Sequence, residues 1–279
     1  MTVVGGVRPI VAVGPEALRA LLARTERITD LRDLSRALGY DAAWEAAPPG
    51  PWVGDSEAAW PRRYIPAVPL TTFLFDLDGT LIDSIELILE SYRHTMQVHR
   101  GTQPPDSTWM AGLGTPLWVQ FRDFSNDETE IKAMVETYRA YNLAHHDEMV
   151  RPYDGVVDAV RALHARGKLG LVTSKLRSGA VRGIRLVKIE DCFDVIVGAD
   201  DVTHPKPHPE PVLKALAALG AAADTAVYIG DSRHDIECGR AAGVRTAAVL
   251  WGPFDRAHLA DLEPDYWLEK PADLAQLTG

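Results

Sequence analysis

The order of apolar and polar positions changes character at about residue 70. From there on, short apolar runs alternate with stretches whose apolar residues recur at helical spacing. The short runs are TTFLF (71–75), LGLVTS (169–174), FDVIVG (193–198), AVYIG (226–230) and TAAVL (246–250). The helical stretches include Gly155–Ala165, Pro209–Leu219 and Asp235–Ala242. This alternation predicts an α/β fold with a doubly wound parallel sheet and helices on both of its faces.

A long insertion separates the first two apolar runs. It covers residues 85–150, and its main patterns, Ile85–Val98 and Asp127–His146, have helical periodicity. An insertion of this length exceeds a simple crossover connection. We therefore expect an inserted α-helical cap domain at 85–150, over the sheet edge of a core domain made of 70–84 and 151–279.

Residues 1–69 do not show this alternation of short apolar runs and helical stretches. Two helical patterns, at 15–27 and 31–38, precede a passage rich in Pro, Gly and Trp at 46–69. We expect a helical and irregular N-terminal extension that packs on the core, with an arm used for assembly as the alternative.

Chemically distinctive residues follow four of the predicted strands. They are Asp76, Asp78, Gly79 and Thr80 after the first run, Thr173 and Ser174 at the end of the second, Lys206 in the loop HPKPHPEP after the third, and Asp231 and Asp235 after the fourth. In an open parallel sheet, ligands bind beyond the carboxyl ends of the strands. The sequence therefore predicts that these residues converge on one site.

The combination suits phosphoryl transfer. Asp76 and Asp78, two apart on an extended segment, point the same way, so that one can attack phosphorus while the other handles the leaving group's proton. Oxygens of Asp76, Asp231 and the backbone near Asp78 are ligands that Mg²⁺ prefers. Lys206 can neutralise the nucleophile and the phosphoryl group, and Thr173 can donate a hydrogen bond to it. These residues predict a Mg²⁺-dependent phosphohydrolase that works through an aspartyl-phosphate.

Four segments in order, FDLDGT, VTSK, the lysine of HPKPHPEP and YIGDSRHD, resemble the motifs of the haloacid-dehalogenase-like hydrolase superfamily. The resemblance covers about residues 70–275. It implies that Asp76 is the nucleophile and Asp78 the general acid/base, with Mg²⁺ held by Asp76, the Asp78 carbonyl and Asp231. It also implies that Thr173 and Lys206 are catalytic residues that hold the phosphoryl group. The residues expected to support them are Gly79, Thr80, Ser174 and Asp235.

Within that superfamily, longer stretches are similar to phosphoglycolate phosphatases and to their pyrophosphatase relatives. They are FDLDGTLIDS, YRAYNLAHHDEMVRPYDGV and GDSRHDIECGRAAG, and the HHDE stretch leans toward the pyrophosphatases. Two features depart from the pattern. Residues 1–69 have no counterpart in a minimal enzyme of this kind, and Ser174 precedes Lys175 where many relatives have Asn before Lys.

The cap offers candidates for substrate specificity. A cationic side chain such as Arg122 suits a second anionic group on the substrate, and His145 and His146 are further candidates. The turn GLGTPL, with Gly114 and Thr115, is a predicted specificity loop because glycine exposes backbone donors close to a ligand.

Other functions stay open to different degrees. A phosphosugar mutase keeps both aspartates and is the main alternative. A non-catalytic binding module that uses residues 1–69 would need a damaged site, whereas every motif position is intact. Asp78 disfavours a dehalogenase. A phosphonate-cleaving enzyme needs a cap lysine, and Lys132 is the only lysine in the insertion.

The composition limits the binding partners and the cellular location that can be expected for the protein. A net charge of −10 without a Lys/Arg cluster argues against nucleic-acid binding. The two cysteines, Cys192 and Cys238, fit a reducing compartment as buried apolar filler. The N-terminus lacks the features of a secretory signal, and no apolar stretch is long enough to cross a bilayer. We expect a cytoplasmic protein that acts on a small phosphorylated metabolite or pyrophosphate, without a membrane partner. A homodimer is left open.

Overall fold

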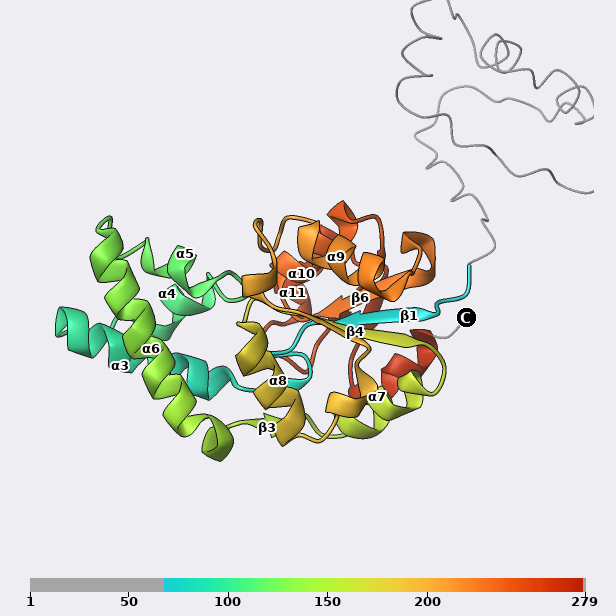
Figure 1. Ribbon diagram of the computed structural model, residues 1–279, viewed down its shortest axis with the longest axis horizontal. Helices are drawn as coiled ribbons and strands as arrows, with labels where there is room; N and C mark the ends of the chain where they lie inside the picture. The colour runs from blue at the N-terminus through green and yellow to red at the C-terminus, as the bar shows by residue number, and fades with distance from the viewer. Residues whose placement is uncertain (1–67, 278–279) are drawn as a thin grey trace, which may run out of the picture. The chain divides into compact units, whose positions relative to one another are not determined.

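A computed structural model describes residues 68–277 (Figure 1). The strands are β1 (Thr72–Phe75), β2 (Ile82–Asp83), β3 (Arg151–Pro152), β4 (Lys168–Val172), β5 (Val195–Val197), β6 (Ala226–Gly230), β7 (Arg245–Val249) and β8 (Tyr266–Leu268). The α-helices are α3 (Ile85–Arg100), α4 (Asp106–Met110), α5 (Leu117–Phe121), α6 (Glu128–Met149), α7 (Val156–His164), α8 (Arg177–Leu186), α9 (Glu210–Leu219), α10 (Arg233–Ala241) and α11 (Arg256–Leu259). The helices predicted within residues 1–67 lie outside the described residues.

Six strands form one parallel sheet in the order β5-β4-β1-β6-β7-β8. β1 lies between β4 and β6, and Phe75 is in register with Leu171 on one side and Ile229 on the other. The predicted doubly wound parallel sheet is therefore confirmed. Every residue of β1 and β6 is buried, as is expected of strands that are covered on both faces.

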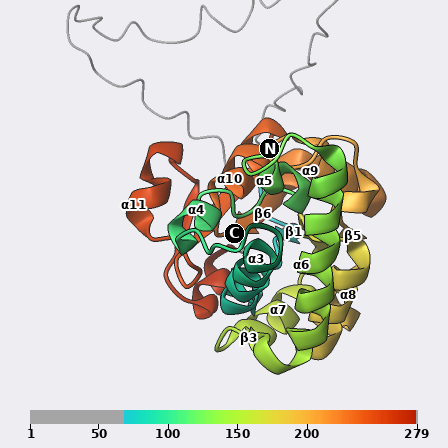
Figure 2. The ribbon, with the colours of Figure 1, turned by 90° about the vertical axis from the view of Figure 1, so that its left-hand side faces the viewer.

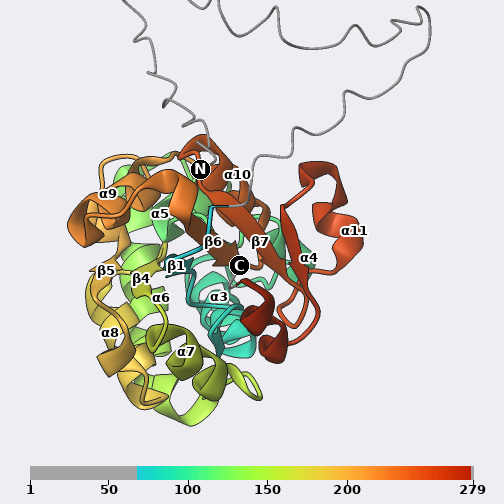
Figure 3. The same cartoon turned by 90° about the vertical axis from the view of Figure 1, so that its right-hand side faces the viewer.

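Alternate side chains of β1 reach the two faces of the sheet. Phe73 and Phe75 pack with the residues of α7 and α8 on one face, whereas Leu74 packs with those of α9 and α10 on the other. Figure 3 shows the two helix layers on either side of the strands. The carboxyl ends of the strands are therefore left uncovered by these layers and open toward helices α3, α4, α5 and α6, called the cap helices below.

Helices α3, α4, α5 and α6 form a separate helical layer beside the sheet, with α3 and α6 packed along each other (Figure 2). Its apolar centre is rich in aromatic rings: Trp109 stacks on Tyr92 at 4.1 Å between ring centroids and also contacts Phe121 and Tyr138. The helical character expected of this insertion is confirmed. The two chain connections to the sheet, β2 and β3, pair with each other as a short antiparallel ribbon.

The structure adds elements that the sequence pattern did not predict. α8 contains Gly179 and Gly183, which are poor helix formers and weaken its pattern. Gly183 packs closely on the core, because a Cβ there would lie 3.1 Å from Ile82 Cδ1. α6 also extends three residues beyond the predicted His146, to Met149. Among residues 68–277, no helix combines the length and the apolar character that a membrane crossing needs.

Candidate active site

Most of the polar residues predicted at the strand ends line one cavity of about 580 Å³ between the sheet and the cap helices: Asp76, Asp78, Thr173, Ser174, Lys206 and Asp231. Thr80 and Asp235 are not in the cavity wall but contact Asp231 and Lys206. The core supplies most of the cavity's charged groups, because β1 ends directly before Asp76, β4 before Thr173 and β6 before Asp231. The backbone N–H of Asp76 still donates to Ile229 O at 2.9 Å, which extends the sheet pairing to this residue. The sheet thus fixes the position of Asp76 up to its own backbone.

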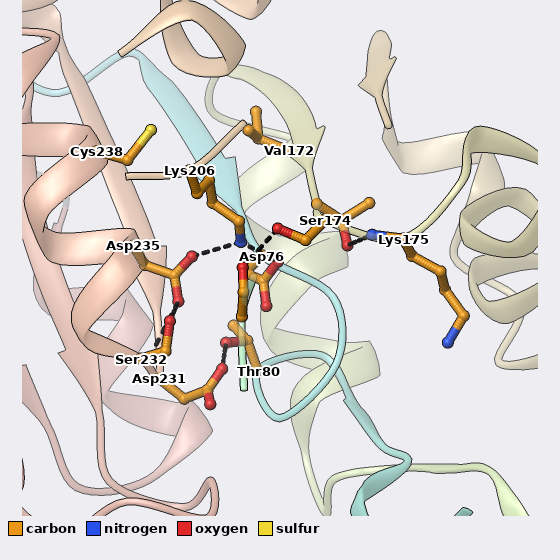
Figure 4. A network of polar contacts seen from close by, with 12 residues as sticks. Asp76, Thr80, Val172, Ser174, Lys175, Lys206, Asp231, Ser232, Asp235 and Cys238 are labelled. Atoms are coloured by element: carbon orange, nitrogen blue, oxygen red, sulfur yellow. Dashed lines mark hydrogen bonds and ion pairs between the residues drawn. The ribbon is translucent and has the colours of Figure 1, made fainter. Parts of the chain in front are cut away.

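Lys206 lies between two carboxylates (Figure 4). Its Nζ donates to Asp76 Oδ1 at 2.8 Å and to Asp235 Oδ1 at 2.7 Å, and its side chain is only 2% exposed. Asp235 is itself held by Ser232, whose backbone N–H and hydroxyl both donate to Oδ2, at 3.0 and 2.6 Å. The hydroxyl of Tyr228 lies 2.9 Å from Asp235 Oδ1. Buried charges need such complete pairing, so this network holds the lysine against Asp76.

Asp231 lies beside the turn that follows β1. The hydroxyl of Thr80 donates to Asp231 Oδ1 at 2.8 Å. Gly79 has a φ of +88°, and a Cβ at this position would lie 2.6 Å from Asp231 Oδ2. Both the left-handed backbone and the close carboxylate require glycine here. The Asp-Gly-Thr turn therefore brings the carboxylate of Asp231 close to the end of β1.

Carboxylate oxygens of Asp76, Asp231 and Asp235 lie within 4.8 Å of one another, and all three residues are buried. Burial raises the pKa of Asp76 to about 7, with Lys206 acting in the opposite direction and Asp235 adding to the increase. Burial, and then the charges of Asp235 and Asp76, raise the pKa of Asp231 well above its usual value. A cluster with more negative than positive charge, made of hard oxygen ligands, fits a divalent cation such as Mg²⁺.

Asp78 has different partners. Ser84 Oγ donates to Asp78 Oδ1 at 2.6 Å, and Lys175 Nζ donates to the same oxygen at 2.8 Å. Burial alone would raise the pKa of Asp78, but the charge and hydrogen bond of Lys175, together with Ser84, hold it below the usual value. The two neighbouring aspartates therefore differ in their electrostatic surroundings, although both line the same cavity.

The segment after β4 bridges the core and the cap. The hydroxyl of Thr173 lines the cavity and accepts a hydrogen bond from the Lys175 backbone N–H at 3.1 Å. Ser174 Oγ donates to the carbonyl of Gly114, in the cap, at 2.6 Å. Gly114 has a φ of +95°, and a Cβ there would lie 2.9 Å from Ser232 Oγ. The cap turn thus lies directly on the core residues of the site.

Of the insertion residues that were predicted to contact the substrate, some line the cavity and others do not. Gly114, Thr115 and His146 line the cavity. Arg122 does not: its side chain is half exposed, pairs with Glu128 at 2.7 Å and lies over the ring of Trp118. His145 also lies outside the cavity wall, where its ring stacks on Tyr141 and its Nδ1 lies 2.9 Å from the Tyr141 carbonyl.

Several residues that the sequence reasoning did not select belong to the site. Arg139 and Asn142 of α6 line the cavity, and Ser84, Lys175 and Tyr228 hold the carboxylates. Lys175 and Ser84 stand close to the motifs in sequence, so proximity alone could have suggested them. Arg139 and Asn142 lie in the stretch YRAYNLAHHDEMVRPYDGV, whose resemblance to known phosphatases, together with their helical spacing with His146, could have pointed to them. Cys192 and Cys238 are buried as expected and free of disulfides.

Comparison with known proteins gives a consistent result. The family model of the haloacid dehalogenase-like hydrolases matches residues 73–249. The chain is 44% identical to pyrophosphatase PpaX of Anoxybacillus flavithermus over 211 residues, which cover 75% of this chain and 97% of that protein. It is 41% identical to pyrophosphatase PpaX of Halalkalibacterium halodurans with the same coverage. A haloacid dehalogenase-like family hydrolase from Streptococcus pneumoniae has a similar structure, with a TM-score of 0.66 and 28% identity over 74% of this chain and 97% of that one.

Proposed function

Because the chain belongs to the haloacid dehalogenase-like hydrolases, and its pyrophosphatase relatives indicate a hydrolase of phosphate compounds, we propose that it cleaves a small phosphoanhydride, with inorganic pyrophosphate as the first candidate. We further propose that the reaction depends on Mg²⁺ and passes through a phosphoryl group on Asp76. The observation that carries the proposal is the buried Asp76 carboxylate, paired with Lys206 and grouped with Asp78, Asp231 and Thr173 in one cavity.

Each protein group has a role that its position supports. A carboxylate oxygen of Asp76 attacks phosphorus, and the bond to the leaving oxygen breaks. Lys206 and the Thr173 hydroxyl offset the charge of the phosphoryl oxygens. Asp78, which Lys175 and Ser84 hold as a carboxylate, takes a proton from the water that hydrolyses the acyl phosphate and passes it to the released phosphate. The phosphate that leaves pyrophosphate in the first step departs as an anion and needs no proton from Asp78.

The metal site would use Asp76, Asp231 and the carbonyl of Asp78, with Asp235 and Thr80 positioning the neighbouring groups. The three grouped carboxylates fit this assignment because a single lysine does not offset their charge. When bound, Mg²⁺ would draw negative charge from the phosphoryl oxygens.

The proposed choice of an anhydride rests on the relatives named as pyrophosphatases, which this chain covers almost completely. A small phosphomonoester such as phosphoglycolate is the second candidate, because the cavity wall also carries the apolar side chains of Trp109, Leu113 and Leu117. An organic leaving group would contact these side chains. A panel of pyrophosphate, phosphoglycolate, sugar phosphates and nucleotides decides between the two candidates, and product analysis with a bisphosphate primer tests for mutase activity.

Asp76→Asn tests the mechanism. The variant keeps the shape of the side chain and removes the nucleophile, so we expect phosphate release to fall by at least about a thousandfold. Trapping of radiolabelled phosphate on the acid-quenched protein should vanish with it. Asp158→Asn on α7, an exposed carboxylate away from the cavity, is the control and should keep wild-type activity. Turnover near the wild-type level in Asp76→Asn would contradict the aspartyl-phosphate mechanism.

A further inference from the structure

His146 has a buried polar atom that the fold itself does not satisfy. The residue lies near the C-terminal end of α6, and its side chain is only 2% exposed. Its Nε2 has no hydrogen-bond partner among residues 68–277, although the residue lines the same cavity as Asp76 and Asp78. Leaving a buried polar atom unpaired is unfavourable, so such atoms in native sites commonly have a ligand or water as their partner.

The imidazole of His146 is held in one orientation from behind. Its Nδ1 lies 2.8 Å from Asp147 Oδ1, and Arg182 Nε of the core helix α8 donates to the same oxygen at 2.9 Å. Because an ionised carboxylate only accepts, Nδ1 carries the proton, and the neutral ring has its lone pair on Nε2. Burial lowers the pKa of His146, and Lys175 and Arg182 act in the same direction against Asp147, which favours this neutral form.

The same face of α6 carries two further polar residues. Arg139, Asn142 and His146 are three and four positions apart, which places them on one side of the helix, and all three line the cavity. Arg139 is exposed and forms no ion pair with any residue that the structure describes. Lys175 lines the cavity from the core. The part of the cavity that faces α6 therefore suits an anionic group that also has a hydrogen to donate.

We propose that His146 is a specificity-determining residue whose Nε2 accepts a hydrogen bond from the P–OH of the distal phosphoryl group of a phosphoanhydride, with Arg139, about two turns away on the same face of α6, as a cationic contact. The inference rests on the proposed phosphohydrolase function and goes further, because it predicts how the site distinguishes pyrophosphate from phosphoglycolate. A distal phosphoryl group of pyrophosphate retains a proton near neutral pH, whereas the carboxylate of phosphoglycolate does not. The lone pair of Nε2 would attract the first group and repel the second.

The experiment compares His146→Leu and His146→Gln with wild type on pyrophosphate, phosphoglycolate and p-nitrophenyl phosphate. In His146→Leu, we expect KM for pyrophosphate to rise by at least about tenfold, as is typical of one lost hydrogen bond to a charged ligand, with a smaller change in kcat. The values of kcat/KM for the other two substrates should change by less than about threefold. His146→Gln has a carbonyl oxygen as acceptor and should recover part of the loss. His145→Leu, the adjacent histidine outside the cavity, should resemble wild type.

Binding gives a second measurement that does not depend on turnover. In the Asp76→Asn background, calorimetry should show that His146→Leu weakens pyrophosphate binding by a similar factor and leaves inorganic phosphate binding nearly unchanged.

Equal losses for all three substrates, or an unchanged preference for pyrophosphate, would overturn the role of His146 while the phosphohydrolase function stands. A wild-type protein that hydrolyses none of the three would overturn the function and this inference together. If His146→Leu does not fold, the same comparison is made with His146→Gln: a rise in KM that is confined to pyrophosphate supports the acceptor role, whereas kinetics equal to those of His145→Leu, or an equal loss on all substrates, oppose it.

Discussion

At the scale of single residues, the site depends on one buried lysine shared by two carboxylates. Lys206 contacts Asp76 and Asp235 with less than 3 Å to each, and all three side chains are almost fully buried. Removing one partner of a buried ion pair is far more costly than removing the whole pair, because an uncompensated charge stays behind. The stability and the activity of this site should therefore respond differently to single and double substitutions.

Lys206→Met should lower both the stability of the folded protein and its activity. It leaves Asp76 and Asp235 without their cation, and the expected loss in the free energy of unfolding is about 3–5 kcal/mol. Adding Asp235→Asn removes one of the two uncompensated carboxylates, so the double variant should regain part of the stability but none of the activity. Urea unfolding and phosphate release measure the two effects separately. A double variant less stable than Lys206→Met would contradict the shared ion pair.

The residues of this network differ in how far sequence could predict them. Asp76, Asp231 and Lys206 were predictable because each follows a recognisable strand, and parallel strands bring their carboxyl ends to one edge. Tyr228 could not be selected in this way. It lies inside an apolar strand, where a tyrosine normally indicates packing, and only its hydroxyl next to Asp235 shows a polar role.

At the scale of elements, the cap turn was predicted as a turn and is one, whereas its role in substrate specificity stays a prediction. The predicted turn at 112–117 lies against Ser174 and Ser232 because Gly114 has no side chain. By contrast, the orientation of α6 was not predictable. Its polar residues occur on more than one face, and only the packing of Met134 and Tyr138 into the cap core directs Arg139, Asn142 and His146 to the cavity.

Gly114→Ala should disturb the contact between this turn and the core. The new Cβ would lie 2.9 Å from Ser232 Oγ, in a left-handed backbone that costs about 1–2 kcal/mol for a residue with a side chain. We expect kcat/KM for pyrophosphate to fall by at least about tenfold, since small displacements of positioning groups have effects of this size.

Gly101→Ala is the matched control for this prediction. Gly101 ends α3 with a φ of +65°, and a Cβ there would meet no atom within 4 Å. This variant carries the same kind of backbone strain, so it should lower the melting temperature while kcat/KM stays near the wild-type value. Equal kinetic losses in the two variants would assign the effect to strain and not to the turn's contact with Ser232.

At the scale of the whole described region, the cap and the core are joined in two ways. The ribbon of β2 and β3 connects them covalently, and Arg182 of α8 donates to the side chain of Asp147 and to the carbonyl of Leu143 on α6. The ribbon could be placed from sequence near Asp83 and Pro152, because the helical insertion had to leave and re-enter the sheet there. The arginine contact could not, since it depends on how the two parts meet.

Metal binding should be visible in the stability of the folded protein. The carboxylates of Asp76, Asp231 and Asp235 repel one another without a cation, and burial strengthens the repulsion. A cation that binds the folded state alone should stabilise it by about 2.7 kcal/mol at a hundred times its dissociation constant. We therefore expect Mg²⁺ to raise the melting temperature of wild type relative to EDTA, and phosphate release to stop in EDTA and return with Mg²⁺.

Asp231→Asn makes this prediction specific to the site. The amide removes one of the repelling charges, so in EDTA the variant should be at least as stable as wild type, which is unusual for a buried substitution. It also removes a metal ligand, so the increase in melting temperature with Mg²⁺ should largely disappear. Asp158→Asn, away from the cavity, should keep the full increase. An undiminished increase in Asp231→Asn would show that the stabilising ion binds elsewhere, because the only change in that variant is the loss of one carboxylate from the proposed ligand set.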